Sequence, residues 1–277
     1  MTRYRELYYR HRLPVRIMHW VNVVAMTVLL MSGLMIFNAH PALYWGDQSY
    51  AGAPEVLRIG AVNTSANGKS EPRGVTTLLG HRFDTTGWFG VADNARGVAT
   101  RQAFPHWLTI PSTYSLAAAR RWHFFFMWVF VVNGLVYVLW SVLSRHLTRD
   151  LVPTRTDLGS IWQSVKDHVR FKHPTGDAAK RYNVLQKLTY LFVIFVLLPL
   201  VIVTGFAMSP ALNAVWAGWV DLLGGRQSAR TLHFVAAFGV VAFTALHVFL
   251  VIATGLWNNL RSMITGRFRI DRVIYDD

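Results

Sequence analysis

Four long apolar segments constrain the fold of this chain more than any other feature of its sequence. They cover residues 17–37, 122–143, 188–208 and 232–256, and each is nearly free of Asp, Glu, Lys and Arg. About 20 such residues in a helix can cross a bilayer. The chain is 53% hydrophobic and 15% charged, whereas soluble proteins are about a quarter charged. We therefore expect an all-α integral membrane protein, a single membrane domain over residues 1–277 built as a bundle of four transmembrane helices.

The distribution of positive charge predicts how these helices are oriented. Of the 28 Lys and Arg residues, five precede the first segment, nine lie between residues 145 and 187, and four follow the last segment. Short connections rich in Lys and Arg stay in the cytoplasm, so both termini are expected on the cytoplasmic side of the membrane. The basic start, MTRYRELYYRHRLPVRIMHW, precedes an apolar stretch that is too long for a signal peptide, so we expect an uncleaved anchor.

The net charge and the absence of cysteine exclude several functions. The formal charge of +14 suits the anionic lipid of the inner leaflet, and no basic patch belongs to a soluble fold of the kind that binds nucleic acid. A chain without cysteine has no disulfide, no iron–sulfur cluster and no covalently attached haem. Any haem in this chain must therefore be bound non-covalently.

The connection at residues 39–119 is longer than a simple linker. Loops beyond about 15 residues are uncommon unless they have a function, and the aromatic side chains here, such as Trp45, Trp88 and Trp107, are unusual in a disordered segment. We expect an extracytoplasmic cap on the membrane surface, with short hairpins or helical turns. On the cytoplasmic side, residues 157–169 are expected to form an amphipathic helix along the membrane, and the C-terminus to be a short polar tail.

Four of the eleven histidines lie inside the apolar segments: His19, His123, His233 and His247. Because the first helix runs outward and the second and fourth run inward, His19 and His247 are expected near the cytoplasmic side, and His123 and His233 near the outer side. His233 and His247 are about 21 Å apart along one helix and leave nearly the same face. The other seven histidines fall in loops, where solvated or capping roles are the default: His11, His40, His81, His106, His146, His168 and His173.

Two imidazoles from different helices at one depth can supply both axial ligands of a haem iron, and a metal with both axial positions filled favours electron transfer over oxygen chemistry. Two such haems would carry electrons across most of the bilayer. An interhelical hydrogen bond explains a single membrane histidine equally well. Zinc is a weaker alternative, because the apolar segments lack the further ligands that it needs.

Glycines and arginines near these histidines have two interpretations each. The glycines either let a flat macrocycle approach the backbone or allow close helix packing; they are Gly33, Gly134, Gly205 and Gly239. The arginines either contact haem propionates or anchor the helices at the membrane interface; they are Arg16 on the inner side, and Arg120, Arg121 and Arg230 on the outer side.

Several motifs together resemble the bacterial di-haem membrane cytochrome b family, which includes the gamma subunit of formate dehydrogenase and the cytochrome b subunits of nickel–iron hydrogenase and thiosulfate reductase. The first span opens with RLPVRIMHW, the second is RRWHFFFMWVFVVNGLVYVLW, the third opens with KRYNVLQKLTYL, and the fourth carries the two histidines fourteen residues apart. These motifs cover most of the chain outside the first connection. The resemblance implies two non-covalent b-type haems, an inner one on His19 and His247 and an outer one on His123 and His233.

The same resemblance implies electron exchange between a membrane quinone and a redox partner subunit. Asn183 and Gln186 match a segment that the family places near the inner quinone site. The alternative is that Asn183 only caps the helix and that Lys187 extends to lipid phosphates. The long first connection departs from the formate dehydrogenase and hydrogenase relatives, and is more similar to the b-type cytochromes that accompany extracytoplasmic molybdopterin oxidoreductases. A partner of that kind is therefore expected.

Two other functions remain open from the sequence. One is a stand-alone superoxide:quinone oxidoreductase of the same fold, which would need an exposed edge of the outer haem. The other is a membrane anchor or transporter without redox chemistry, although transporters tend to show inverted repeats and broken helices and the sequence shows neither.

Overall fold

The computed structural model describes residues 2–50, 52–66, 69–94, 96–169, 182–216 and 218–274. They form two compact units. Unit 1 comprises Met1–Asn22, Val132–Pro199 and Phe238–Asp277, and unit 2 comprises Val23–Val131 and Leu200–Ala237. Each of the four long helices contributes one segment to each unit.

Four helices of the described chain are long and apolar enough to cross a membrane, as the sequence predicted. They are α1 (Leu13–Asn38), α2 (Leu116–Leu143), a helix over Val184–Ala207, and α9 (Arg226–Ala253). All begin several residues before their apolar windows. The fourth ends at Ala253 instead of at about residue 256, because Gly255 adopts a φ of 107°, which a right-handed helix cannot include.

The third span is one apolar helix with an irregular turn in its middle. It consists of α5 (Val184–Phe192), a π-helical turn over Val193–Leu197, and α6 (Leu198–Ala207). The turn ends two residues before Pro199, which has no N–H group for a helical hydrogen bond and whose ring crowds the preceding turn. A wider turn accommodates this residue without ending the helix.

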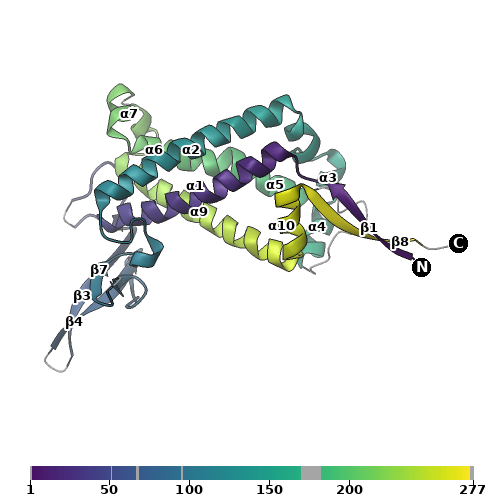
Figure 1. Ribbon diagram of the computed structural model, residues 1–277. Helices are drawn as coiled ribbons and strands as arrows, with labels where there is room; N and C mark the ends of the chain where they lie inside the picture. The colour runs from purple at the N-terminus through teal and green to yellow at the C-terminus, as the bar shows by residue number, and fades with distance from the viewer. Residues whose placement is uncertain are drawn as a thin grey trace. The chain divides into compact units, whose positions relative to one another are not determined.

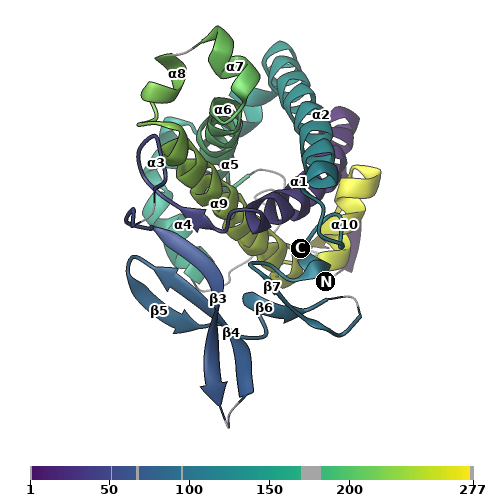
Figure 2. The same cartoon turned by 90° about the vertical axis from the view of Figure 1, so that its left-hand side faces the viewer.

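The segment between α1 and α2 is built of β-strands and belongs to unit 2, which corrects the all-α expectation. β2 (Ala42–Leu43), β3 (Leu57–Ala66), β4 (Lys69–Leu78) and β5 (His81–Asp84) form an antiparallel sheet in that order, and β6 (Gly90–Asp93) pairs with β7 (Ala99–Gln102). A 3-10 turn, η1 (His106–Leu108), follows. Figure 2 shows the long β3–β4 hairpin with β5 at one edge. The short hairpins expected in this cap are therefore present.

Two glycines let the two sheets of the cap approach closely. A Cβ atom on Gly74 of β4 would lie 2.1 Å from the carbonyl oxygen of Phe89, and one on Gly90 of β6 would lie 2.1 Å from the carbonyl oxygen of Gly60. Gly90 also has a φ of 82°, which L-residues with a side chain rarely adopt. The sheets therefore pack backbone against backbone at this point.

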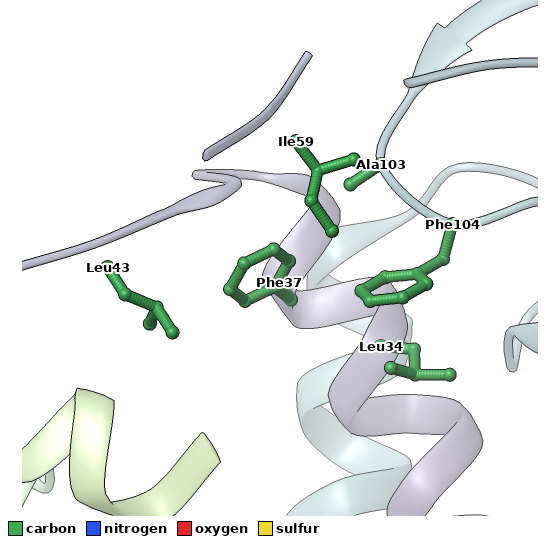
Figure 3. Close-up of a cluster of buried hydrophobic side chains, with 6 residues drawn as sticks. All are labelled: Leu34, Phe37, Leu43, Ile59, Ala103 and Phe104. Atoms are coloured by element: carbon green, nitrogen blue, oxygen red, sulfur yellow. The ribbon is translucent and has the colours of Figure 1, made fainter. Parts of the chain in front are cut away.

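A buried apolar cluster joins the end of α1 to the cap (Figure 3). Its members are Leu34, Phe37, Leu43, Ile59, Ala103 and Phe104. Beside it, the Asn38 side chain pairs with the backbone of Phe104: its amide nitrogen donates to the carbonyl oxygen at 3.2 Å, and its oxygen accepts from the backbone N–H at 2.7 Å. The cap is thus packed onto α1 and is not a loose loop.

In unit 1 the two ends of the chain pair with each other. β1 (Thr2–Tyr9) and β8 (Arg267–Ile274) form an antiparallel ribbon over their full length, next to α10 (Leu256–Thr265), as Figure 1 shows. The expectation of a polar C-terminal tail was therefore wrong. Gly266, with a φ of 83°, turns the chain from α10 into β8; a Cβ atom there would lie 2.5 Å from the Tyr9 ring.

The predicted amphipathic helix at residues 157–169 is divided into α3 (Arg155–Gly159) and α4 (Ile161–Val169). Thr154 and Asp157 form a capping box at the start of α3, which satisfies two backbone N–H groups. Leu158 and Trp162, on the predicted apolar face, are 49% and 69% exposed. The remaining short helices are η2 (Leu147–Leu151), α7 (Pro210–Val215) and α8 (Gly218–Asp221).

Candidate functional site

His123 of α2 and His233 of α9 face each other in unit 2. Their ring centroids are 6.4 Å apart and the ring planes meet at 70°. In unit 1, His19 of α1 and His247 of α9 form a second pair, with centroids 6.3 Å apart and planes at 64°. The structure therefore brings together the same two pairs that the depth argument predicted from the sequence.

The distance between the two rings of each pair is the distance expected for two imidazoles bound to one metal ion. A metal–imidazole bond is about 2 Å long and the ring centre lies roughly 1 Å beyond the nitrogen, so two imidazoles on opposite sides of one metal have centroids about 6 Å apart. Both pairs have this spacing. Among the described residues, no group of three or more His, Cys, Asp or Glu side chains could hold a metal. The donor sets fit an ion that needs only two protein ligands, as a bis-histidine haem iron does.

Hydrogen bonds fix the tautomer of His123. Its Nδ1 atom lies 3.2 Å from the carbonyl oxygen of Leu29 and 3.1 Å from Oγ of Ser32. The carbonyl can only accept, and the Ser32 hydroxyl donates its own hydrogen to the carbonyl of Val28 at 2.6 Å. Nδ1 must therefore carry the proton, which leaves Nε2 as the free ligating nitrogen.

His233 has the same environment on other helices. Its Nδ1 atom lies 3.0 Å from the carbonyl oxygen of Val201 and 3.2 Å from Oγ1 of Thr204. The Thr204 hydroxyl donates to the carbonyl of Leu200 at 2.6 Å. Nε2 of His233 is thus also left free. The Nδ1 contacts that fix these tautomers are of the kind that orient metal-binding histidines.

The sequence reasoning missed this arrangement, although a short repeat marks it. LLMSG at residues 29–33 of α1 surrounds His123, and VIVTG at residues 201–205 of α6 surrounds His233. In both, an apolar residue supplies the carbonyl and a small hydroxyl residue followed by glycine completes the contact. Five residues are too few to stand out as an internal repeat without the structure.

The two glycines of these repeats make room for the imidazoles. A Cβ atom on Gly33 would lie 3.4 Å from Cε1 of His123, and one on Gly205 would lie 3.2 Å from Cε1 of His233. The flat group that approaches the backbone is therefore an imidazole ring, that of His123 at Gly33 and that of His233 at Gly205. Neither interpretation of these glycines from the sequence included this contact.

Gly205→Ala is expected to displace the His233 ring by a few tenths of an ångström and to weaken haem retention by about ten-fold, as changes beside a metal ligand commonly do. The measurement is the rate of haem transfer to apomyoglobin. Gly134→Ala is the matched control, because a Cβ atom there meets nothing within 4 Å. Equal haem loss from both variants would contradict the contact.

Gly239, whose Cβ would lie 3.2 Å from Leu197, fits the packing interpretation.

Arg230 is held by the backbone of the cap. Its Nη1 donates to the carbonyl of Ala42 at 3.0 Å and its Nη2 to the carbonyl of His40. Thr231 Oγ1 donates to the carbonyl of Tyr44 at 2.6 Å. The first turns of α9, directly before His233, are therefore hydrogen-bonded to residues 40–44, where the chain enters the cap.

The other three candidate arginines have different surroundings. Arg16 donates through Nη2 to the carbonyl of Ile264, in unit 1. Arg120 lies over the ring of Phe124 at 5.5 Å. Arg120 and Arg121 are exposed, so their guanidinium groups remain accessible.

Asn183 and Gln186 form a capping box at the start of α5. The Asn183 oxygen accepts from the N–H of Leu185 at 3.0 Å, and the Gln186 oxygen accepts from the N–H of Asn183 at 3.1 Å. Both oxygens are used, whereas neither amide NH2 group donates to a described residue. Of the third-span motif, Lys180 and Arg181 lie outside the described residues, as does the loop residue His173.

Lys187 is buried and paired with a carboxylate. Its Nζ lies 2.8 Å from Oδ2 of Asp157, and the residue is 7% exposed. The hydrogen bond from Lys187 lowers the pKa of Asp157 to about 2. This pair ties α5 to α3.

Two loop histidines have partners that the sequence did not indicate. His11 Nδ1 lies 3.3 Å from the hydroxyl of Tyr182, and burial together with Arg10 lowers the pKa of His11 to about 4. His146 is 7% exposed and lies 2.6 Å from Asp150. Burial also raises the pKa of Tyr182.

The chain matches known proteins over most of its length. The family model for prokaryotic cytochrome b561 matches residues 10–266. The chain is 26% identical over 247 residues to a protein of Azospira oryzae named putative protein-methionine-sulfoxide reductase subunit YedZ1, covering 89% of this chain and 92% of that protein. It is 25% identical over 272 residues to a probable Ni/Fe-hydrogenase B-type cytochrome subunit of Cupriavidus necator, covering 93% and 85%. No solved structure matches the chain. With four apolar helices and this family match, the chain belongs to the prokaryotic cytochrome b561 family of bacterial membrane proteins and is a cytochrome b-type electron-transfer subunit.

Proposed function

We propose that this chain binds two b-type haems and transfers electrons across the bacterial inner membrane between the quinone pool and an extracytoplasmic redox subunit. One observation carries the proposal: two separate histidine pairs, His19 with His247 and His123 with His233, have the ring spacing of two axial ligands. Haem held by these residues would supply one-electron chemistry without a further ligand.

The chain's own residues hold and orient these ligands. α9 supplies one histidine to each pair, and α1 and α2 supply the others. Because His233 and His247 lie fourteen residues apart on one continuous helix, about 21 Å along its axis, the two haems would lie at different depths. The positive charge of the short connections supports a cytoplasmic position for His19 and His247 in this proposal. The same charge would contact anionic lipid there.

The cap is the proposed docking site for the redox partner. Both relatives are named as subunits, one of a reductase and one of a hydrogenase, so a partner subunit is expected here too. Large aromatic side chains of the kind that anchor protein interfaces are exposed on the cap: Trp45 (56%), Trp88 (70%) and Trp107 (60%). The resemblance of this long connection to that of b-type cytochromes that accompany extracytoplasmic molybdopterin oxidoreductases supports a partner of that kind.

The proposed quinone contact is the start of α5. A buried quinone carbonyl needs hydrogen-bond donors to offset its desolvation. The amide NH2 groups of Asn183 and Gln186 are such donors, since the capping box uses only the side-chain oxygens. Capping and quinone binding are therefore compatible at these residues.

Asn183→Ser is expected to slow haem reduction by added quinol several-fold while both haems stay bound, because it removes the NH2 donor and keeps a good helix cap. Asn183→Leu removes donor and cap together, and is expected to slow the reaction at least as much. The measurement is anaerobic stopped-flow reduction of the haems. Unmodified rates in Asn183→Ser, Gln186→Leu and the double variant would place the quinone elsewhere.

The same assay separates the proposed function from its alternatives. A haem-containing protein that is reduced by quinol supports the quinone-linked function. Reduction by superoxide at the outer haem, with no partner subunit retained during purification, would favour a stand-alone superoxide:quinone oxidoreductase. A protein that stays colourless after haem supplementation would favour a membrane anchor or transporter.

A further inference from the structure

The two histidine pairs differ in what lies behind the rings. In the His123–His233 pair, each Nδ1 atom has a backbone carbonyl and a hydroxyl group within 3.2 Å. Among the described residues, no hydrogen bond reaches a ring nitrogen of His19 or His247, whose ring contacts are aromatic: Trp20 at 5.5 Å and Phe243 at 5.9 Å.

The two hydroxyl groups are specific to the first pair. Ser32 and Thr204 are both fully buried, at 0% exposure. Thr27 of α1 and Thr244 of α9 also donate to the carbonyl four residues earlier, at 2.8 Å each, but among the described residues no hydrogen bond joins either hydroxyl to a histidine. Bonding of this kind is ordinary for helical hydroxyls in apolar surroundings. What distinguishes Ser32 and Thr204 is that the lone pairs of the hydroxyl oxygen point at an imidazole N–H.

We infer that Ser32 and Thr204 are positioning residues that tune only the haem held by His123 and His233, lowering its reduction potential. This inference rests on the proposed function, because it concerns the haems that the two pairs would hold. A hydroxyl that has given its hydrogen to a carbonyl is polarised and becomes a better acceptor. An imidazole whose Nδ1–H is shared between two acceptors donates more electron density through Nε2. Stronger donation stabilises ferric over ferrous iron and lowers the potential.

The test is a redox titration of the purified protein, followed in the haem α-band, for Ser32→Ala and Thr204→Val. The wave assigned to the His123–His233 haem is expected to move to higher potential in each variant and further in the double variant. The other wave stays in place. The His233→Ala and His247→Ala variants assign the waves, because each retains one haem.

Two sets of controls separate positioning from packing. Thr27→Val and Thr244→Val remove a comparable hydroxyl without touching a ring and are expected to titrate like the unmodified protein. Ser32→Thr and Thr204→Ser keep the acceptor and are expected to restore the original potential. If Ser32→Ala or Thr204→Val loses the haem instead, the conservative variants decide: haem retained at the original potential in Ser32→Thr and Thr204→Ser supports the inference, and a shifted potential overturns it.

Unmoved waves in Ser32→Ala and Thr204→Val, or equal effects from Thr27→Val and Thr244→Val, would overturn the inference and leave the proposed function intact. An unmodified protein without haem would instead refute the proposed function, so the two failures are distinguishable.

Discussion

Replacing His233 with alanine is expected to remove one of two haems and leave the other in place. The variant leaves His123 without a partner at 6.4 Å, and a single imidazole does not hold a low-spin haem. His247→Ala is expected to remove the other haem, because it breaks the His19–His247 pair. The measurement is pyridine haemochrome quantitation per polypeptide, which should fall by about half in each variant.

The matched control is His106→Ala. His106 is a cap residue whose Nδ1 lies 2.9 Å from the backbone carbonyl of Asp93, so this variant should keep the full haem content. The double variant His233→Ala/His247→Ala should bind none. Full haem content in both single variants would show that the ligand assignment is wrong.

Replacing Trp88 and Trp107 together with alanine is expected to uncouple the partner subunit from the membrane chain. Both side chains are more than half exposed, at 70% and 60%, so their loss should not affect folding. Truncating an aromatic anchor at an interface commonly costs about 2 kcal/mol or more, and about 2 kcal/mol corresponds to roughly thirty-fold weaker binding. Partner retention during mild-detergent purification and partner-dependent haem reduction should both fall, with the haem spectra unchanged.

This pair of substitutions is a sharper test than deleting residues 60–103. The deletion would also uncouple the partner, but it removes Ala103 from the buried cluster that holds the cap on α1. Trp257→Ala is the control, because Trp257 is 81% exposed in α10 of the other unit. Normal partner-dependent turnover in the Trp88→Ala/Trp107→Ala variant would show that the cap is not part of the partner interface. Loss of haem in that variant would show that the cap serves as a structural lid.

The sequence predicted the spans and both histidine pairs because these depend on properties that a single chain displays. Apolar length determines which segments cross a membrane, and helix direction determines which histidines share a depth. The pairs His19–His247 and His123–His233 follow from these two rules. The capping interpretation of Asn183 likewise follows from its residue type before a helix.

Other features could not be predicted because they depend on contacts distant in the chain. β1 and β8 pair across almost the whole sequence, although RFRI, at residues 267–270, alternates polar and apolar residues in the way strands do. The contacts of Ser32 with His123 and of Thr204 with His233 require the helix positions. For Arg230 the sequence left open a haem propionate contact and anchoring at the membrane interface; its bonds to cap carbonyls arise from the path of residues 40–42, which the sequence does not reveal.

The most direct test of this account is the haem content of the unmodified protein. Purified from cells supplied with a haem precursor, the chain should contain about two non-covalent, low-spin b-type haems per polypeptide by pyridine haemochrome assay, as the two histidine pairs require. A content of one haem would mean that only one pair ligates. A colourless protein that takes up no added haem would contradict the account at its centre.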